Sequence, residues 1–435
     1  MGGSIQPARR PASILESQSI HNLTLMNQTT TSCGSADAAP QTERLPLAAL
    51  LALAMTGFIC IMTETLPAGL LPQIGLGLNI SPALAGQMVT AYALGSLLAA
   101  IPLTMATRGW RRRNVLLLTI VGFLVFNSVT AMSSSFVLVM VARFFAGVSA
   151  GLAWSLLAGY ARRMVAPHLQ GRAMSVAMVG TPIALSLGVP LGTWLGNLVG
   201  WRTAFGIMSL LTLLLIVWVL AKVPDYPGQS GSKRLPLRQV FTTPGIRPVL
   251  GVVVTWMLAH NILYTYVAPF VAPAGLGGKV DVVLLVFGIA ALAGIWITGR
   301  VVDLHLRAAI LASLGAFALT ALVLGLWADS AAVMYTCVGV WGLSFGGAAT
   351  LLQTALADAA ADGADVALSI NVVTWNSAIA GGGLLGGLLL GGLGVASFPW
   401  VALILVLASM WIAHAARAHG FPPGHRASNS AVARH

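Results

Sequence analysis

The chain has 435 residues, of which 57% are hydrophobic and only 8% are charged, and its formal net charge is +12. Because soluble globular proteins carry about 25% charged residues, this composition excludes a large soluble core and predicts a protein that crosses a membrane many times. In a soluble chain the positive charge would favour nucleic acid as a partner. Here the placement of Lys and Arg explains the charge, so we expect no nucleic-acid partner.

Residues 1–44 are polar and lack the apolar core of a signal peptide, so we expect a disordered cytoplasmic tail there. The cysteines Cys33, Cys60 and Cys337 have no spacing typical of a disulfide or a metal site. We therefore expect no metal and no cofactor.

Twelve apolar segments follow, each long enough to span a bilayer as a helix of about 20 residues. They cover residues 46–72, 84–107, 114–132, 136–164, 172–197, 202–222, 245–272, 281–302, 308–327, 332–358, 365–393 and 398–416. The short breaks contain Pro, Gly, Ser or charged residues. The pattern predicts an all-α integral membrane fold with twelve transmembrane helices.

One long break, residues 223–244, is polar, basic and rich in Pro and Gly. It predicts a cytoplasmic linker between two six-helix bundles, which we place at residues 45–222 and 245–416. Residues 417–435 then form a second cytoplasmic tail.

Basic residues gather in alternate breaks of the chain. All but three of the 23 Lys and Arg residues lie in one set of alternate breaks, in the linker, at the two ends of the chain or at the edges of these regions. The exceptions are Arg143, Arg202 and Lys279. Cytoplasmic loops of membrane proteins carry such an excess of positive charge. The distribution therefore predicts a multi-pass protein with both termini in the cytoplasm.

The halves carry similar short basic loops, Ala106–Arg113 after the second segment and Gly299–Arg307 after the eighth. A doubled six-helix plan is typical of secondary transporters, whose substrate site lies near the membrane midplane between the halves. We therefore expect alternating access around a central site.

Glu64 is an acid inside the first apolar segment, where an ionisable residue is costly and usually functional. If that segment ends at Pro72, Glu64 lies about 12 Å deep, and Arg143 in the fourth segment lies about 10 Å deep. The matching depth favours pairing. The pair either exchanges protons during transport or is a structural ion pair.

Further polar and aromatic groups lie within other apolar segments. His260, Tyr264 and Tyr266 offer hydrogen bonds and ring faces in the seventh segment. The remaining candidates for the substrate cavity are Tyr92, Gln353, Asn371, Trp375 and Asn376. Each of these side chains either lines the cavity or forms an interhelical hydrogen bond.

Gly188, Pro190 and Gly192 stand close together in the fifth segment. Glycines one turn apart allow close helix packing, and proline permits a bend. The glycine-rich run at 381–394 lies in an apolar segment and indicates packing, not a nucleotide loop.

Residues 45–416 resemble the major facilitator superfamily. The sequence motifs that carry the resemblance are ETLPAGLLPQI, LNISPALAGQMVTAYALG, ARFFAGVSAG, GVPLGTWLGNLVGWRTAF, HNILYTYVAPF and GRVVDLHLR. Within the superfamily the chain is similar to the twelve-span drug:proton antiporters, in the branch of arabinose-, purine-nucleoside- and chloramphenicol-exporter-like proteins. The resemblance implies proton coupling at Glu64 and Arg143. It also implies that Gly188, Pro190 and Gly192 form an antiporter motif, which favours export.

The chain departs from the superfamily's cytoplasmic gate motif, which reads like G-x-x-x-D-R-x-G-R-R. In the first half, Leu103 and Thr107 stand at the Gly and Asp places. The gate residues that remain are Arg108, Arg111 and Arg112 in the first half, and Gly299, Arg300, Asp303 and Arg307 in the second. We predict that Arg300, Asp303 and Arg307 form a charge clamp that closes the cytoplasmic side. Alternatively, the basic residues serve topology alone.

The leading hypothesis is a monomeric exporter in a bacterial inner membrane that exchanges small organic molecules, such as drugs, for protons. Export of sugars or purine nucleosides, and a symporter or importer of the same fold, remain alternatives. A membrane enzyme is disfavoured because the sequence has no metal-ligand cluster, nucleophile elbow or ATP loop. A channel is disfavoured because the doubled plan suits alternating access.

Overall fold

The computed structural model of the protein describes residues 1–3, 44–228 and 236–424. Nearly all of the predicted N-terminal tail, the middle of the linker and the last eleven residues, 425–435, lie outside this description. Residues Thr42–His435 form one compact unit. All statements below concern the described part of that unit.

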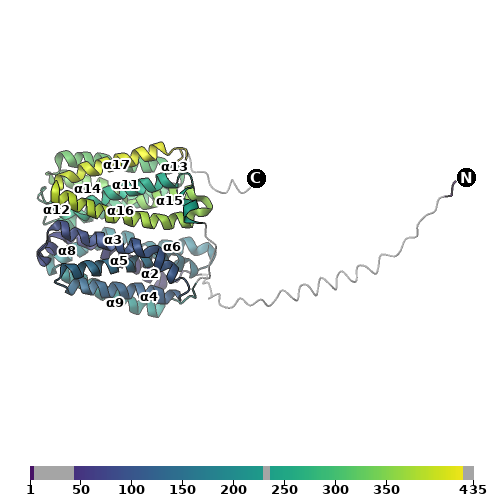
Figure 1. Ribbon diagram of the computed structural model, residues 1–435, viewed down its shortest axis with the longest axis horizontal. Coiled ribbons are helices and arrows are strands. Elements are labelled where there is room, and N and C mark those ends of the chain that lie inside the picture. Colours follow the sequence, from purple (N-terminus) through teal and green to yellow (C-terminus); the bar gives the residue numbers. More distant parts are fainter. Residues whose placement is uncertain (4–43, 229–235, 425–435) are drawn as a thin grey trace. The chain divides into compact units, whose positions relative to one another are not determined.

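Helices make up both halves of the unit (Figure 1). The first half contains α2 (Leu47–Leu78), α3 (Pro82–Ala106), α4 (Arg112–Met132), α5 (Phe136–Arg163), α6 (Gln170–Met178), α7 (Gly180–Ile183), α8 (Val189–Val199) and α9 (Trp201–Lys222). After the short linker helix α10 (Leu237–Phe241), the second half contains α11 (Ile246–Thr265), α12 (Val267–Val271), α13 (Val280–Trp327), α14 (Ala331–Gly346), α15 (Ala348–Ala360), α16 (Ala364–Gly392) and α17 (Phe398–Ala415). In Figure 1 the purple and blue helices of the first half and the green and yellow helices of the second gather separately, with α3 beside α16.

The predicted all-helical membrane fold is confirmed. Among the described residues, eleven helical segments are long and apolar enough to cross a membrane. One of them is α13, whose 48 residues would extend about 72 Å, more than twice the roughly 30 Å thickness of a hydrocarbon core. It contains both the eighth and the ninth predicted segments. They meet at His305, a non-helical residue with φ −134° and ψ 43°, and not in the short loop that we expected.

The first helix is longer than predicted. We expected it to end at Pro72, but α2 continues to Leu78, where Asn79 in the left-handed conformation donates its N–H to the carbonyls of Gly75 and Leu76. Proline is tolerated inside a membrane helix because neighbouring groups satisfy the freed carbonyl. Glu64 therefore lies near the middle of α2, about 21 Å from its end, and the predicted depth of 12 Å is wrong. We call this side of the bundle the Asn79 end, and the opposite side the Arg111 end.

Three other predicted segments are interrupted helices. The fifth contains a π-helical turn, Ala184–Gly188, which only Val189 separates from Pro190. A proline ring clashes with the carbonyl four residues before it, and a wider turn relieves that clash. The seventh is broken at Tyr266, between α11 and α12, and the tenth at Gly347, between α14 and α15.

The two halves repeat one close helix–helix contact. In the first half, a Cβ added to Gly95 or to Gly147 would lie 1.9 Å from a backbone oxygen across the α3–α5 contact. In the second half, a Cβ on Gly294 would lie 2.1 Å from the Leu343 oxygen, and one on Gly342 would lie 2.3 Å from the Phe287 oxygen, across α13–α14. Glycine lets the backbones approach closely, which drives packing where no hydrophobic force acts between helices.

These contacts generate a stability prediction. Gly147→Ala forces α5 away from the Tyr92 carbonyl, so we expect the free energy of unfolding to fall by about 1–3 kcal/mol. Thermal unfolding in detergent measures the change. Gly206→Ala in α9 is the matched control, because no atom lies within 4 Å of its added Cβ. Equal losses in both variants would show that the close contact is not the cause.

Candidate functional site

Glu64 lies inside the first half with its side chain almost covered, at 8% relative exposure. In the part of the chain that the structure describes, its carboxylate makes no hydrogen bond and no ion pair. An ionisable group in such surroundings is costly unless its charge changes. The arrangement leaves the carboxylate available for protonation.

Arg143 is fully buried beside Glu64, but it does not bond the carboxylate. Its Nη2 donates to the backbone carbonyl of Glu64 at 3.4 Å, and its Nε donates to the backbone carbonyl of Met88 at 3.4 Å. Its guanidinium carbon lies 4.9 Å from the centre of the Tyr92 ring, at a distance typical of a cation–π contact. The guanidinium is thus held by backbone and ring, while its charge remains close to the acid.

The part of α2 around Glu64 is hydrogen-bonded to its neighbours on two sides. The Tyr92 hydroxyl donates to the Cys60 carbonyl at 2.9 Å, one turn before Glu64. The Asn127 amide donates to the Thr63 hydroxyl at 2.9 Å. Sequence reasoning missed Asn127, although an amide within the third apolar segment was the available signal. These bonds keep the acid in place between α3, α4 and α5.

The glycine–proline motif of the fifth segment packs against the helix that carries Glu64. A Cβ added to Gly188 would lie 2.6 Å from Met62 Sδ, and one added to Gly192 would lie 2.8 Å from Leu66 Cδ1. Cβ atoms essentially never come that close to another heavy atom. The motif therefore leaves room for the Met62 and Leu66 side chains of α2 against the fifth span.

His260 and Tyr264 lie in an aromatic group of the second half. We call it the aromatic cluster, and its members are His260, Tyr264, Phe287, Trp341 and Phe345. The His260 ring stacks on Phe345 with centroids 3.5 Å apart, and it lies 5.3 Å from Trp341. In the described part of the chain, His260 Nδ1, the Tyr264 hydroxyl and Trp341 Nε1 are buried without a hydrogen-bond partner.

The cluster lies near Glu64. Helices α2 and α11 pack against each other, and Tyr264 is close enough to Glu64 for an electrostatic interaction. Buried polar groups normally have partners, so three groups without one among the described residues make this cluster a candidate for contact with a ligand or water. The structure thus brings together Glu64, Arg143, Tyr92, His260 and Tyr264 from the predicted set.

The other cavity candidates are more dispersed. Asn371 and Asn376 are buried in α16; Asn376 bonds the Val372 carbonyl of its own helix, and Asn371 Oδ1 has no partner among the described residues. Trp375 is half-buried and Gln353 is exposed. Tyr266 is fully buried where α3 meets α16, so contact with a substrate would require that region to open.

At the Arg111 end, the linker supplies an acid that sequence reasoning missed. Arg111 Nε lies 2.5 Å from Asp225 Oδ2, and the Arg113 backbone N–H donates to Asp225 Oδ1 at 3.2 Å. The gate motif has Thr107 in place of its usual acid, and Arg112 bonds the Thr107 carbonyl at 2.8 Å. The available signal was the single acid in the sequence VPDYPG, directly after the sixth segment.

These contacts change the acidity of Asp225. Burial by itself would raise the pKa of this carboxyl, but hydrogen bonds from Arg111 and Arg113, together with their charges, hold the pKa below its ordinary value. The Arg112 backbone N–H also donates to the Tyr226 carbonyl at 2.8 Å, and the Tyr160 hydroxyl donates to the Pro224 carbonyl at 2.6 Å. The start of the linker is thus fastened to the first half.

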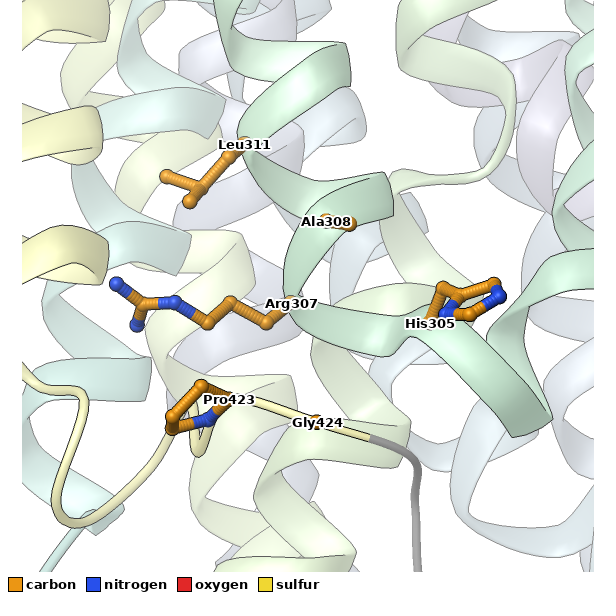
Figure 2. A pocket seen from close by; sticks show the side chains of 6 residues that line it. All are labelled: His305, Arg307, Ala308, Leu311, Pro423 and Gly424. Carbon is orange, nitrogen blue, oxygen red and sulfur yellow. The ribbon is translucent and has the colours of Figure 1, made fainter.

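The predicted gate residues of the second half lie near the His305 break. Arg307 Nη1 donates to the Ala413 and Phe421 carbonyls at 2.8 and 2.7 Å, which fastens the end of α17. Figure 2 shows Arg307 and His305 extending in opposite directions beside a pocket of about 310 Å³. Arg300 covers the Trp296 ring, Gly299 and Asp303 are exposed, and Arg108 is half-buried. The charge clamp stays a prediction.

Comparison with known proteins adds relatives and a fold match. A model of the Major Facilitator Superfamily matches residues 53–383. The purine ribonucleoside efflux pump NepI of Escherichia coli O6:K15:H31 is 29% identical over 316 residues, covering 71% of this chain and 80% of the pump. NepI of Shigella sonnei is 30% identical over 315 residues, covering 72% and 79%. A crystal structure of a bacterial homologue of the human lysosomal transporter Spinster matches with a TM-score of 0.61 and 14% identity, covering 87% of this chain and 97% of that one.

Asp225 generates a prediction about pH. Because its pKa is depressed in the folded state, the pair stabilises the fold above the ordinary carboxyl pKa of about 3.9, and the contribution is lost as pH falls through the lower folded value. Arg111 is 67% exposed, so solvent screens the pair. We expect Asp225→Asn to cost about 1 kcal/mol at pH 7.

Thermal melts from pH 7 to pH 3 measure this difference. The melting temperatures of Asp225→Asn and wild type should converge at the acidic end. The matched control is Asp329→Asn, an exposed loop acid that should match wild type throughout. A difference that is constant with pH would contradict the role of the charge.

Proposed function

The chain belongs to the Major Facilitator Superfamily and is a membrane transporter, and on that premise we propose that it exports small organic molecules in exchange for protons by alternating access. The observation that carries the proposal is the buried carboxylate of Glu64, which has no partner among the described residues and lies beside a guanidinium held by other groups. The NepI relatives are named as efflux pumps, which supports export.

The geometry around Glu64 suits reversible protonation. Burial favours the neutral acid, and the nearby positive charge of Arg143 favours the carboxylate. Because Arg143 is bonded to backbone carbonyls, the Glu64 side chain can rotate without disrupting those bonds. We propose that the acid binds a proton when the site faces one side of the membrane and releases it when the site faces the other.

The glycine–proline motif of the fifth span supports the proposed antiport. Gly188 and Gly192 leave room for side chains of α2 against the fifth span, and the π-helical turn before Pro190 supplies a place where that span can bend. Any change of angle at that turn acts on the helix that carries Glu64.

The aromatic cluster favours one substrate class among the alternatives. Aromatic faces with nearby unpaired polar groups suit a planar ring that carries hydrogen-bonding groups. Purine nucleosides have this chemistry, whereas sugars lack the flat ring. We therefore propose nucleosides as the first substrates to test, ahead of aliphatic drugs and sugars.

Glu64→Gln tests proton coupling. Everted membrane vesicles with an imposed pH gradient should lose at least about tenfold of gradient-driven substrate accumulation, because the amide cannot exchange a proton. Substrate exchange without a gradient should persist. Asp329→Asn serves as the control, since this acid lies exposed in the α13–α14 loop. Intact gradient-driven transport by Glu64→Gln would contradict a role of Glu64 in proton coupling.

Trp341→Leu tests the ring site. Loss of the indole face should raise the KM for a purine nucleoside by roughly threefold to tenfold, the size of an aromatic contact. Radiolabelled adenosine in the same vesicles provides the measurement, with arabinose and chloramphenicol as competitors. Trp411→Leu is the control, because Trp411 is 71% exposed on α17. Competition by arabinose with no transport of adenosine would exclude the nucleoside proposal.

A further inference from the structure

The break in the seventh span puts a tyrosine where the two halves meet. Tyr266 has non-helical torsions, φ −110° and ψ 28°, and it separates α11 from α12. Its side chain is fully buried. The ring extends from the second half to α3 of the first half, at the point where α3 packs against α16.

The tyrosine hydroxyl joins three elements. It donates to the Gly383 carbonyl of α16 at 2.7 Å and accepts from Gln87 Nε2 of α3 at 3.0 Å. The same Gln87 nitrogen lies 3.1 Å from the Gly383 carbonyl, as a second donor to it. One phenol and one amide thus connect α3 of the first half with α16 and the α11–α12 break of the second.

Glycines from both halves make room for the ring. A Cβ added to Gly86 of α3 would lie 2.3 Å from Tyr266 Cε1. A Cβ added to Gly386 of α16 would lie 2.7 Å from Cδ2, and one on Gly387 would lie 2.7 Å from the hydroxyl. The socket therefore exists only because these positions carry no side chain.

We propose that Tyr266 is a positioning residue for transport, which seals the Asn79 end when its ring occupies this glycine socket and must leave the socket for that end to open. The placement of basic residues predicts that this end faces outward. The inference rests on the proposed alternating access. The inference adds a specific contact, between the Tyr266 ring and the glycine socket, that is present in one access state and absent in the other.

The position of Tyr266 also links the seal to the candidate site. Tyr264 of the aromatic cluster lies two residues earlier at the end of α11, and α12 beyond the break packs against α2, the helix of Glu64. A ligand that displaces Tyr264 moves the end of α11 and hence the hydroxyl of Tyr266. A displacement below 1 Å is enough to weaken a hydrogen bond of 2.7 Å.

Thiol labelling from outside intact cells tests the seal. Thr90→Cys is introduced into a chain with Cys33→Ser, Cys60→Ala and Cys337→Ala, because Thr90 is buried on α3 against Gly383. A membrane-impermeant maleimide reaches this cysteine only when α16 moves away. We expect Tyr266→Phe to raise the labelling rate about twofold to tenfold, the effect of losing one neutral hydrogen bond.

A second variant tests the socket without changing the tyrosine. Gly386→Ala puts a methyl group against the ring, so it should also speed labelling. Gly391→Ala is its control, because that glycine lies on the same helix with no atom within 4 Å of the added Cβ. Tyr160→Phe controls for Tyr266→Phe, because it removes the hydroxyl of another buried tyrosine, bonded to a carbonyl at the Arg111 end.

Transport kinetics separate positioning from packing. If Tyr266 positions the access states, Tyr266→Phe changes the maximal export rate while its melting temperature matches that of Tyr160→Phe. The labelling assay needs no substrate and no proton gradient, so its failure is distinct from failure of the efflux proposal. Labelling rates of Tyr266→Phe and Gly386→Ala equal to those of their controls would overturn the inference.

Discussion

Arg143 carries a permanent positive charge in the interior of a membrane protein, and groups from two neighbouring helices hold it there. Two backbone carbonyls and the face of Tyr92 contact the guanidinium, and these groups come from α2 and α3. Its Nη1 has no hydrogen-bond partner among the described residues. Main-chain oxygens become available to a side chain where helices lie close together, which the glycines of the α3–α5 contact permit. Helix packing, burial of the base and the free carboxylate of Glu64 are therefore parts of one arrangement.

The sequence predicted the all-helical membrane fold and the approximate limits of most spans, because apolar length is a direct physical requirement of the bilayer. It did not predict where spans continue or break. Pro72 resembled a helix end, yet α2 passes through it to Asn79; the residues around His305 resembled a loop, yet α13 is interrupted at that residue alone. Such details depend on neighbouring helices, which satisfy or block particular carbonyls and are invisible in a local pattern.

The candidate site was predictable in part for the same reason. Glu64, Arg143 and His260 were evident as polar groups in apolar segments, and the structure places them near the contact between halves. Phe287, Trp341 and Phe345 were not evident, because an aromatic residue in an apolar segment carries no mark of its surroundings. Asp225 was overlooked because it lies in a linker, where an acid usually has only solvent for a partner.

The attachment of that linker defines where one half of the molecule ends. Asp225 pairs with Arg111, and Gly228 lies against the backbone of Gly109, so the chain as far as Gly228 belongs physically to the first half. A chimera that joins this half to another transporter directly after Lys222 would omit the acid and leave Arg111 without its partner. Exchange of halves between relatives, in the laboratory or by recombination, should therefore succeed with a junction beyond Gly228 and be impaired with one before Pro224.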